Sequence, residues 1–218
     1  KTFMANENSY IRQEINSRQM SPFQIQTVFI CTLINMLDGF DVLVMSFAAA
    51  SVSSEWALTP YQLGILLSAG LIGMALGSIS LGALADILGR RKLVNICLVI
   101  VTSGMFASAY SQSEQQLLAF RFFTGLGIGG MLATLTTLVS EYSSESSRGL
   151  CIGFLQSGYP LGALLGGIAS VYLIDSFGWR SLFIFGGSLS LAILPFVFWK
   201  LPESIDFLLF RGDQGDKS

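Results

Sequence analysis

Charged residues are scarce in this 218-residue sequence, and histidine is absent. Lys, Arg, Asp and Glu fill 12% of the positions, about half the share in soluble globular domains, whereas 52% of the positions are hydrophobic. A chain this short and this apolar cannot bury its hydrophobic surface in one core, so lipid must solvate much of it. Without histidine, a carboxylate is the expected proton-handling group.

Cysteine and proline are also sparse, and each scarcity excludes a class of structure. Cys31, Cys97 and Cys151 lie inside apolar segments without CxxC spacing, so we interpret them as buried hydrophobic residues rather than metal ligands or disulfides. With 5 prolines against 23 glycines, the composition favours helices packed through small residues over a loop-rich protein. Because no metal-ligand cluster and no nucleophile–base set stands out, we expect no enzyme activity, no cofactor, no bound metal and no nucleic-acid partner.

Six apolar segments of membrane-spanning length make up most of the sequence. Short connections separate them, so neighbouring segments are antiparallel, and each is about twice as long as a barrel strand needs to be. The predicted fold is an all-α membrane protein, with a six-helix transmembrane bundle at 23–200 between tails at 1–22 and 201–218. The six segments are 23–50, 61–84, 92–111, 117–140, 150–173 and 181–200.

Basic residues are distributed asymmetrically along this bundle. Ten of the twelve lie in the tails, in the second and fourth connections or at the segment ends next to them, and only Arg121 and Arg180 lie toward the opposite side. The positive-inside rule therefore predicts a multi-pass protein of the lipid bilayer with both termini in the cytoplasm.

The sequence also contains an internal repeat. At an offset of 89 residues, Gly64–Arg91 aligns with Gly153–Arg180 without a gap, and 11 of the 28 pairs are identical. Both copies end in a D-x-x-G-x-R pattern, which compositional bias does not easily explain. Three helices separate the copies, so they lie on opposite sides of the membrane. This predicts a 3+3 inverted repeat, of about 23–111 and 117–200, which is typical of secondary transporters.

Two carboxylates and one arginine interrupt the apolar segments. Asp38 and Asp41 lie near the middle of the first segment, where each costs roughly 3 kcal/mol on insertion scales. Their i, i+3 spacing places them on one helix face, and Asn35 extends that face. Such a pair either shares or exchanges a proton or orients the helices through a permanent salt bridge. Arg121, at the start of the fourth segment, is the natural partner for an aspartate or a substrate anion.

Two further groups of polar residues are candidates for function. Asn35, Gln156, Ser157 and Tyr159 either line a central substrate cavity or form hydrogen bonds between helices. In the second connection, a glycine can end the helix and the arginines can meet a carboxylate at another cytoplasmic helix end. The residues of this second group are Gly82, Asp86, Gly89, Arg90, Arg91 and, at the end of the fourth segment, Glu141.

These residues resemble the major facilitator superfamily. The stretch Gly82–Arg91 is similar to its cytoplasmic signature between helices two and three, except that Ile87 stands where the family usually has Arg or Lys. Arg121–Gly129, Gly178-Trp179-Arg180 and Leu201-Pro202-Glu203-Ser204 also resemble elements of this family. The resemblance implies a cytoplasmic gate latch made by Asp86, Arg90 and Glu141, with one arm weakened by Ile87.

Within the superfamily, Asp38-Gly-Phe-Asp41 resembles the aromatic acid:proton symporters, carriers of benzoate and hydroxybenzoates. The stretches Gly158–Gly162 and Phe177–Arg180 resemble the same group, although related organic-anion and sugar carriers share much of the pattern. The resemblance implies that the two aspartates take part in proton coupling and that Arg121 serves coupling or anion binding. It also implies a location in the bacterial cytoplasmic (inner) membrane.

Members of this superfamily have twelve helices in two six-helix halves, with the substrate between the halves. We therefore predict that this sequence supplies the N-terminal half of a proton-coupled transporter for an aromatic acid or related organic anion. Its expected partners are that small anion and a second six-helix half or a second copy of this chain. The alternative is a non-transporting membrane module that acts as an assembly or sensing subunit.

Overall fold

The structure is a computed structural model that describes residues 20–205 and 207–208, apart from the side chain of Asp86. This part of the chain contains six helices long and apolar enough to cross a membrane, which confirms the predicted six-helix fold. The predicted tails, including their basic residues, lie mostly outside the described residues. The helices are α2 (Pro22–Trp56), α3 (Pro60–Leu88), α4 (Arg90–Ala109), α5 (Glu114–Tyr142), α6 (Arg148–Phe177) and α7 (Arg180–Lys200).

Local sequence explains where these helices begin and end. Ser21 and Thr59 each form a capping box with a glutamine three residues later, and each is followed by a proline at the first helical position. Gly89 and Gly178 end α3 and α6 with φ angles of +91° and +76°, a backbone region that favours glycine. The largest difference from the prediction is α2, which continues beyond residue 50 to Trp56 because its last turns are polar but still helical.

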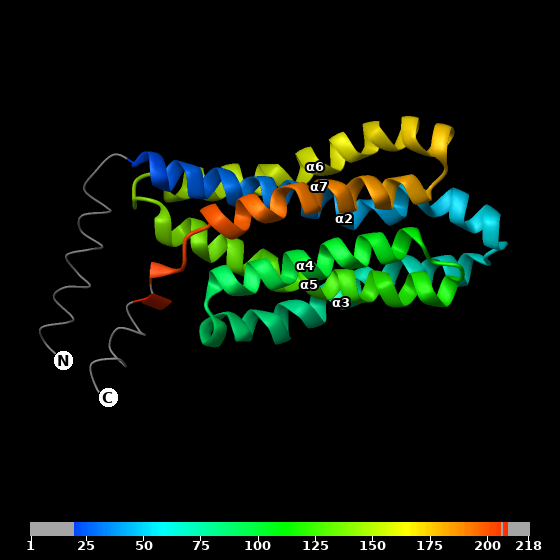
Figure 1. Ribbon diagram of the computed structural model, residues 1–218, viewed down its shortest axis with the longest axis horizontal. Coiled ribbons are helices and arrows are strands. Elements are labelled where there is room, and N and C mark those ends of the chain that lie inside the picture. Colours follow the sequence, from blue (N-terminus) through cyan, green and yellow to red (C-terminus); the bar gives the residue numbers. More distant parts are fainter. Residues whose placement is uncertain (1–19, 206, 209–218) are drawn as a thin grey trace, which may run out of the picture.

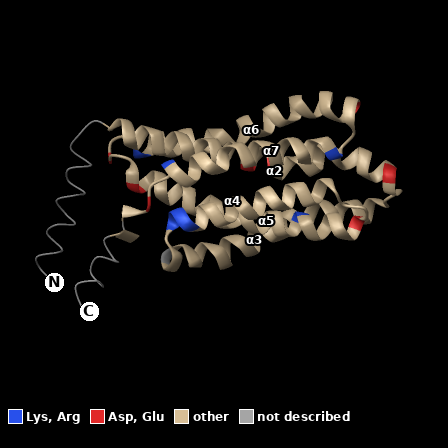
Figure 2. Cartoon of the chain, in the orientation of Figure 1, with Lys and Arg blue, Asp and Glu red and all other residues tan. Residues whose placement is uncertain are grey.

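The helices run antiparallel between two ends of the bundle (Figure 1). The terminal end holds the start of α2, the α3–α4 and α5–α6 connections and the end of α7, whereas the distal end holds the other three connections. Charged residues gather at these two ends, and most of the length between them is uncharged (Figure 2). The distribution is that of a bundle whose middle lies in a bilayer.

The two sequence repeats are interlocked. Helix α3 of the first repeat packs most extensively on α5 of the second, and α6 of the second packs on α2 of the first. Gly73 on α3 abuts the carbonyl of Phe122, and Gly162 on α6 abuts the carbonyl of Met36, so closely that a Cβ at either glycine would overlap the neighbouring backbone. The glycine rows therefore act as packing seams that let helices approach closely.

These glycine contacts show which residues of α2 correspond to which residues of α5 in the inverted repeat. Gly73 and Gly162 are 89 residues apart, as the sequence repeat requires, but their partners Phe122 and Met36 are 86 residues apart. At the same offset of 86, Asn35 on α2 corresponds to Arg121 on α5. The first helices of the two repeats share few identities, so the sequence alone did not reveal this register.

Two apolar core clusters lie along the bundle. The first, nearer the terminal end, includes Ile30, Leu98 and Leu138, and the second, nearer the distal end, includes Leu117 and Phe183. On α2, the buried core residues up to Ile34 belong to the first cluster and those from Phe40 onward to the second. The intramembrane charges of α2 therefore lie where the two clusters meet.

Candidate functional site

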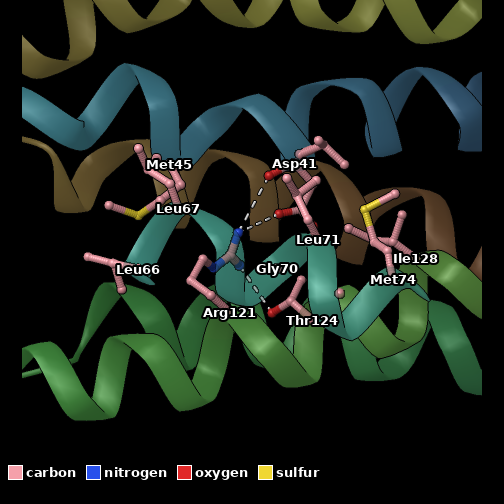
Figure 3. Close-up of a pocket in the computed structure, with 12 residues that line it drawn as sticks. Asp41, Met45, Leu66, Leu67, Gly70, Leu71, Met74, Arg121, Thr124 and Ile128 are labelled. Carbon is pink, nitrogen blue, oxygen red and sulfur yellow. Dashed lines mark hydrogen bonds and ion pairs between the residues drawn. The ribbon is translucent and has the colours of Figure 1, made fainter. Parts of the chain in front are cut away.

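Arg121 and Asp41 form a buried ion pair that joins α5 to α2. The distance from Arg121 Nη1 to Asp41 Oδ1 is 3.0 Å, and the two side chains are 5% and 3% exposed. Figure 3 shows the guanidinium lying between Asp41 on α2 and Thr124 on α5. Removing either partner would leave an uncompensated charge away from water. The sequence-based expectation that Arg121 is a partner of an aspartate is thus realised at Asp41.

The other nitrogens of Arg121 also have partners. Nε donates to Ser108 Oγ at 3.3 Å, and Nη2 donates to Thr124 Oγ1 at 3.1 Å and contacts Met105 Sδ at 3.2 Å. The guanidinium carbon lies 5.0 Å from the centre of the Phe183 ring, within the range of a cation–π contact. An incoming anion would have to displace one of these partners, so the geometry suits a counterion better than an open anion site.

Asp38 lies in a different environment from Asp41. Its side chain is 1% exposed, and its Oδ2 atom has no hydrogen-bond partner in the described part of the chain. Asp41 Oδ2 is likewise buried without a partner among the described residues. Two buried carboxylates thus lie three residues apart on α2, and within the part of the chain that the structure describes only Asp41 is paired with the arginine. The charges of the three groups sum to zero when one of the carboxylates carries a proton.

A small cavity lies beside the ion pair (Figure 3). Its volume is ≈ 30 Å³. A cavity of roughly 10–15 Å³ holds one water molecule, whereas small-molecule sites measure roughly 300–1,000 Å³. This cavity can therefore hold water beside the charges but not an aromatic acid. The residues that line it are Asp41, Val42, Met45, Leu66, Leu67, Gly70, Leu71, Met74, Arg121, Thr124, Gly125 and Ile128.

The other predicted substrate residues do not gather at this cavity. Asn35 donates from Nδ2 to the carbonyl of Leu155 at 2.7 Å, so it ties α2 to α6. Ser157 donates to a carbonyl of its own helix at 2.7 Å. Gln156 is exposed on α6, and Tyr159 is half-buried. Arg121 alone among the predicted substrate residues lines the cavity.

At the terminal end, the predicted pairing of an arginine with Glu141 is present. Arg90 on α4 forms an ion pair with Glu141 on α5. The same carboxylate accepts from Ser204 Oγ at 2.8 Å and from the backbone N–H of Ile205 at 3.1 Å. Glu141 therefore joins the ends of α4 and α5 to the segment that follows α7.

The other residues of the predicted cytoplasmic gate do not all contact the Arg90–Glu141 pair. Gly89 is the junction between α3 and α4, and Arg91 donates from Nη2 to the carbonyl of Phe198 on α7. Nothing in the described structure lies near a Cβ built on Gly82. The side chain of Asp86 lies outside the described residues.

Glu203, for which no individual role was predicted from the sequence, also contributes to this region. Its Oε1 atom accepts from the backbone N–H groups of Arg91 and Ser204, each at 3.0 Å. It thereby caps the start of α4, where Gly89 has no side chain to do so. The family-like Leu-Pro-Glu-Ser stretch was the only signal, because no helix-capping rule relates residues more than one hundred positions apart.

Comparison with known proteins gives matches along nearly the whole chain. The Major Facilitator Superfamily model matches residues 28–211. The 4-hydroxybenzoate transporter PcaK of Pseudomonas aeruginosa is 43% identical over 199 residues, which cover 90% of this chain and 44% of that protein. A gallate transporter of Pseudomonas putida is 37% identical, covering 92% of this chain and 45% of that protein. The chain thus spans a little under half the length of these relatives.

Solved structures share the fold at lower sequence identity. The proton:xylose symporter XylE bound to 6-bromo-6-deoxy-D-glucose superimposes with a TM-score of 0.82 at 21% identity, covering 90% of this chain and 48% of that chain. A bacterial homologue of the human lysosomal transporter Spinster gives a TM-score of 0.75 at 20% identity, covering 85% and 44%. At these identities the likeness establishes the architecture and nothing of the substrate.

Proposed function

The chain belongs to the major facilitator superfamily, and from this premise we propose that it supplies the N-terminal half of a proton-coupled transporter for an aromatic acid or related organic anion. The matched relatives include transporters of 4-hydroxybenzoate, gallate and benzoate, all of which are aromatic acids. The second half is further chain, a separate polypeptide or a second copy. No cofactor is proposed, and protons are the coupling ion.

The observation that carries this proposal is the buried cluster of Asp38, Asp41 and Arg121. A purely structural ion pair needs one carboxylate, and a second buried carboxylate with an unpartnered oxygen adds a large insertion cost. Proton coupling gives the second carboxylate a role. With one proton bound the cluster is neutral, and after the proton leaves, its two carboxylates carry one more charge than the guanidinium balances. A cluster with two such states can link protonation to movement of the helices that hold it.

We place the substrate between this chain and the second half. The cavity beside Arg121 is too small for an aromatic ring, so the second half must complete the binding site. Gln156 and Tyr159 on α6 offer amide and hydroxyl groups that suit a hydroxybenzoate, with the partly exposed Ser157 on the same helix and the buried Asn35 on α2 as further candidates. Arg121 acts first as the counterion of the aspartates and contributes its positive charge to anion binding.

We also propose the orientation and the gate. The terminal end, which carries most of the basic residues, faces the cytoplasm of a bacterial inner membrane. The Arg90–Glu141 pair, together with Gly82, Asp86, Gly89 and Arg91, forms a latch at the cytoplasmic gate. The capped start of α4 gives this latch a rigid support.

Uptake into liposomes tests the proposed function. The chain is reconstituted alone and with a second six-helix half, an inward proton gradient is imposed, and uptake of labelled 4-hydroxybenzoate and benzoate is followed. We expect uptake when both halves are present, loss of uptake in Asp41→Asn, and near-normal uptake in Glu114→Gln, a carboxylate at the distal end. No uptake of either substrate in both settings would contradict the proposed substrates and favour a non-transporting module.

A further inference from the structure

A second cluster of charged and aromatic residues lies at the distal end of the bundle. Glu55, in the last turn of α2, accepts from Trp179 Nε1 at 2.7 Å and forms an ion pair with Arg180 at 2.8 Å. Arg180 also donates from Nη2 to the carbonyl of Ser111 at 3.3 Å and stacks on Trp179 at 4.2 Å. These contacts join the end of α2, the start of α7 and the α4–α5 connection. No role was predicted for Glu55 from the sequence.

This cluster is the inverted-repeat counterpart of the Arg90–Glu141 pair at the terminal end. The offset of 86 residues that relates α2 to α5 places Glu55 on Glu141. The offset of 89 residues that relates α6–α7 to α3–α4 places Trp179 on Arg90. In each copy, a glutamate at the end of one helix binds the residue that follows a helix-ending glycine. The two glycines, Gly89 and Gly178, both have positive φ angles.

The short sequences at the two helix ends agree with this correspondence. Helix α2 ends in Ser54-Glu55-Trp56, and α5 ends in Ser140-Glu141-Tyr142. The structure therefore contains the same interaction at both ends of the bundle. The glutamate binds an arginine, Arg90, at the terminal end and a tryptophan, Trp179, at the distal end.

In the distal cluster, the hydrogen bond from Trp179 to Glu55 stabilises the structure more than the ion pair between Glu55 and Arg180 does. The side chains of Glu55 and Arg180 are 41% and 38% exposed, so water screens their mutual attraction. Trp179 is 3% exposed, and its indole N–H points to the Glu55 carboxylate. Without that acceptor, a buried donor would be left unsatisfied. Glu55 therefore fixes the orientation of the Trp179 ring.

A chain of ring contacts leads from Trp179 to the buried ion pair. The Trp179 and Phe183 rings meet edge to face, with centres 5.7 Å apart. The guanidinium of Arg121 also lies against the fully buried Phe183 ring, 5.0 Å from the ring centre. The orientation of Trp179 thus bears on the position of Arg121 through a single intervening side chain.

We propose that Glu55, Trp179 and Arg180 form a distal latch that closes this end of the bundle and positions Arg121 against Asp41 through Phe183. The three residues act as positioning residues and bind no substrate. The closure is a property of the six-helix chain itself, whereas the effect on proton coupling rests on the proposed function.

Thiol labelling tests the closure without any need for transport. Ser111→Cys introduces a reporter under Arg180 at a buried position, and the three native cysteines are buried. In lipid nanodiscs, Glu55→Ala should raise the rate of maleimide labelling at position 111 about tenfold, because local opening exposes the thiol. Glu55→Gln should raise it much less, since the amide oxygen still accepts from Trp179.

Glu114→Gln is the matched control for labelling. Glu114 lies at the same end, close to Ser111 in the chain, but bonds to Gln62 and not to the cluster. Its labelling rate should stay within about twofold of the parent. An unchanged rate in Glu55→Ala, or an equal rise in Glu114→Gln, would overturn the latch.

The positioning of Arg121 is tested by the pH profile of uptake in the two-half transporter. Trp179→Phe keeps the ring stacking but removes the indole N–H, and it should shift the pH midpoint of uptake by about half a unit, as expected when the surroundings of a coupled charge cluster change. Reduced uptake with an unchanged pH profile would overturn the positioning role. Labelling that rises in a protein without uptake would support the latch and count only against the proposed function.

Discussion

At the scale of single residues, the contrast between Asp38 and Asp41 decides what the buried site can do. They are the same residue type, three positions apart on one helix, and both are buried. Only Asp41 has an arginine as partner in the described structure, although the Oδ2 atom of each aspartate is buried there without a hydrogen-bond partner. This difference is what the proposed proton coupling rests on, because one arginine cannot balance the charge of two ionised carboxylates.

A double-mutant cycle tests the coupling between Arg121 and Asp41. Arg121→Ala alone should destabilise the chain by roughly 3–5 kcal/mol, because it leaves a buried carboxylate without its counterion. Adding Asp41→Asn should recover part of this loss, so that the double change costs less than the sum of the single changes by about 1 kcal/mol or more. Unfolding of the purified chain in mixed micelles gives the free energies. A second cycle, with Glu114→Gln in place of Asp41→Asn, is the control, and its two free-energy changes should add. If the changes add in the Arg121/Asp41 cycle as well, the pairing of these residues is contradicted.

A second residue-scale prediction concerns Glu203. Glu203→Ala should lower the free energy of unfolding by about 1–2 kcal/mol, because two backbone N–H groups lose the carboxylate that caps α4. Amide hydrogen exchange measured by mass spectrometry should show faster exchange at the start of α4. Glu203→Asp, with a shorter carboxylate side chain, should fall between the parent and the alanine variant. Equal protection of α4 in all three proteins would contradict the capping role.

At the scale of the helices, the glycine seams set how closely the two repeats interlock. Gly39 on α2 lies against the backbone of Tyr159 on α6, and Gly129 on α5 lies against that of Met74 on α3. Both contacts leave no room for a Cβ atom. Close approach of α2 to α6 and of α5 to α3 thus holds the two charged helices, α2 and α5, in a fixed register.

Two glycines on one helix allow a matched test of the seam. Gly162→Ala should destabilise the chain by roughly 1–3 kcal/mol, because its methyl group would overlap the backbone of Met36. Gly153→Ala meets no atom within 4 Å, and replacing a helical glycine there should be neutral or stabilise by about 0.5–1 kcal/mol. The two midpoints of thermal unfolding in detergent should therefore move in different directions. A similar loss in both variants would count against close α6–α2 packing.

The sequence predicted these elements better than it predicted their contacts. Six helices followed from hydropathy, and the repeat followed from spacing. Charge indicated an aspartate or a substrate anion as the partner of Arg121 but did not choose between them or between Asp38 and Asp41. The last turns of α2 were missed because Ser53, Ser54 and Glu55 end the apolar run without ending the helix. The hydrogen bond from Asn35 to the carbonyl of Leu155 and the capping of α4 by Glu203 could not be predicted from the sequence. Each joins residues whose proximity depends on how the helices pack and in which register. The unpartnered oxygen of Asp38 depends on packing in the same way.

At the scale of the whole molecule, the helices differ in burial, and α7 lies between the most and the least buried. Helices α2, α4 and α5 are the most buried along their apolar windows, and α3 and α6, which correspond in the repeat, are the least buried. Exposed apolar side chains such as Ile79 on α3 and Ile168 on α6 occupy corresponding positions in the two repeats. These faces are available to lipid and to the proposed second half, while the charged cluster stays inside this chain.

The most direct test of the account is proton movement driven by the substrate. The two-half transporter is reconstituted into liposomes that contain a pH-sensitive dye, and 4-hydroxybenzoate is added outside at neutral pH, with protein-free liposomes as the control for passive entry. We predict acidification of the lumen with the parent protein and none with Asp38→Asn or Asp41→Asn, because each change removes one carboxylate of the coupled pair. Acidification at the parent rate in both asparagine variants would contradict the central claim that these buried aspartates carry the proton.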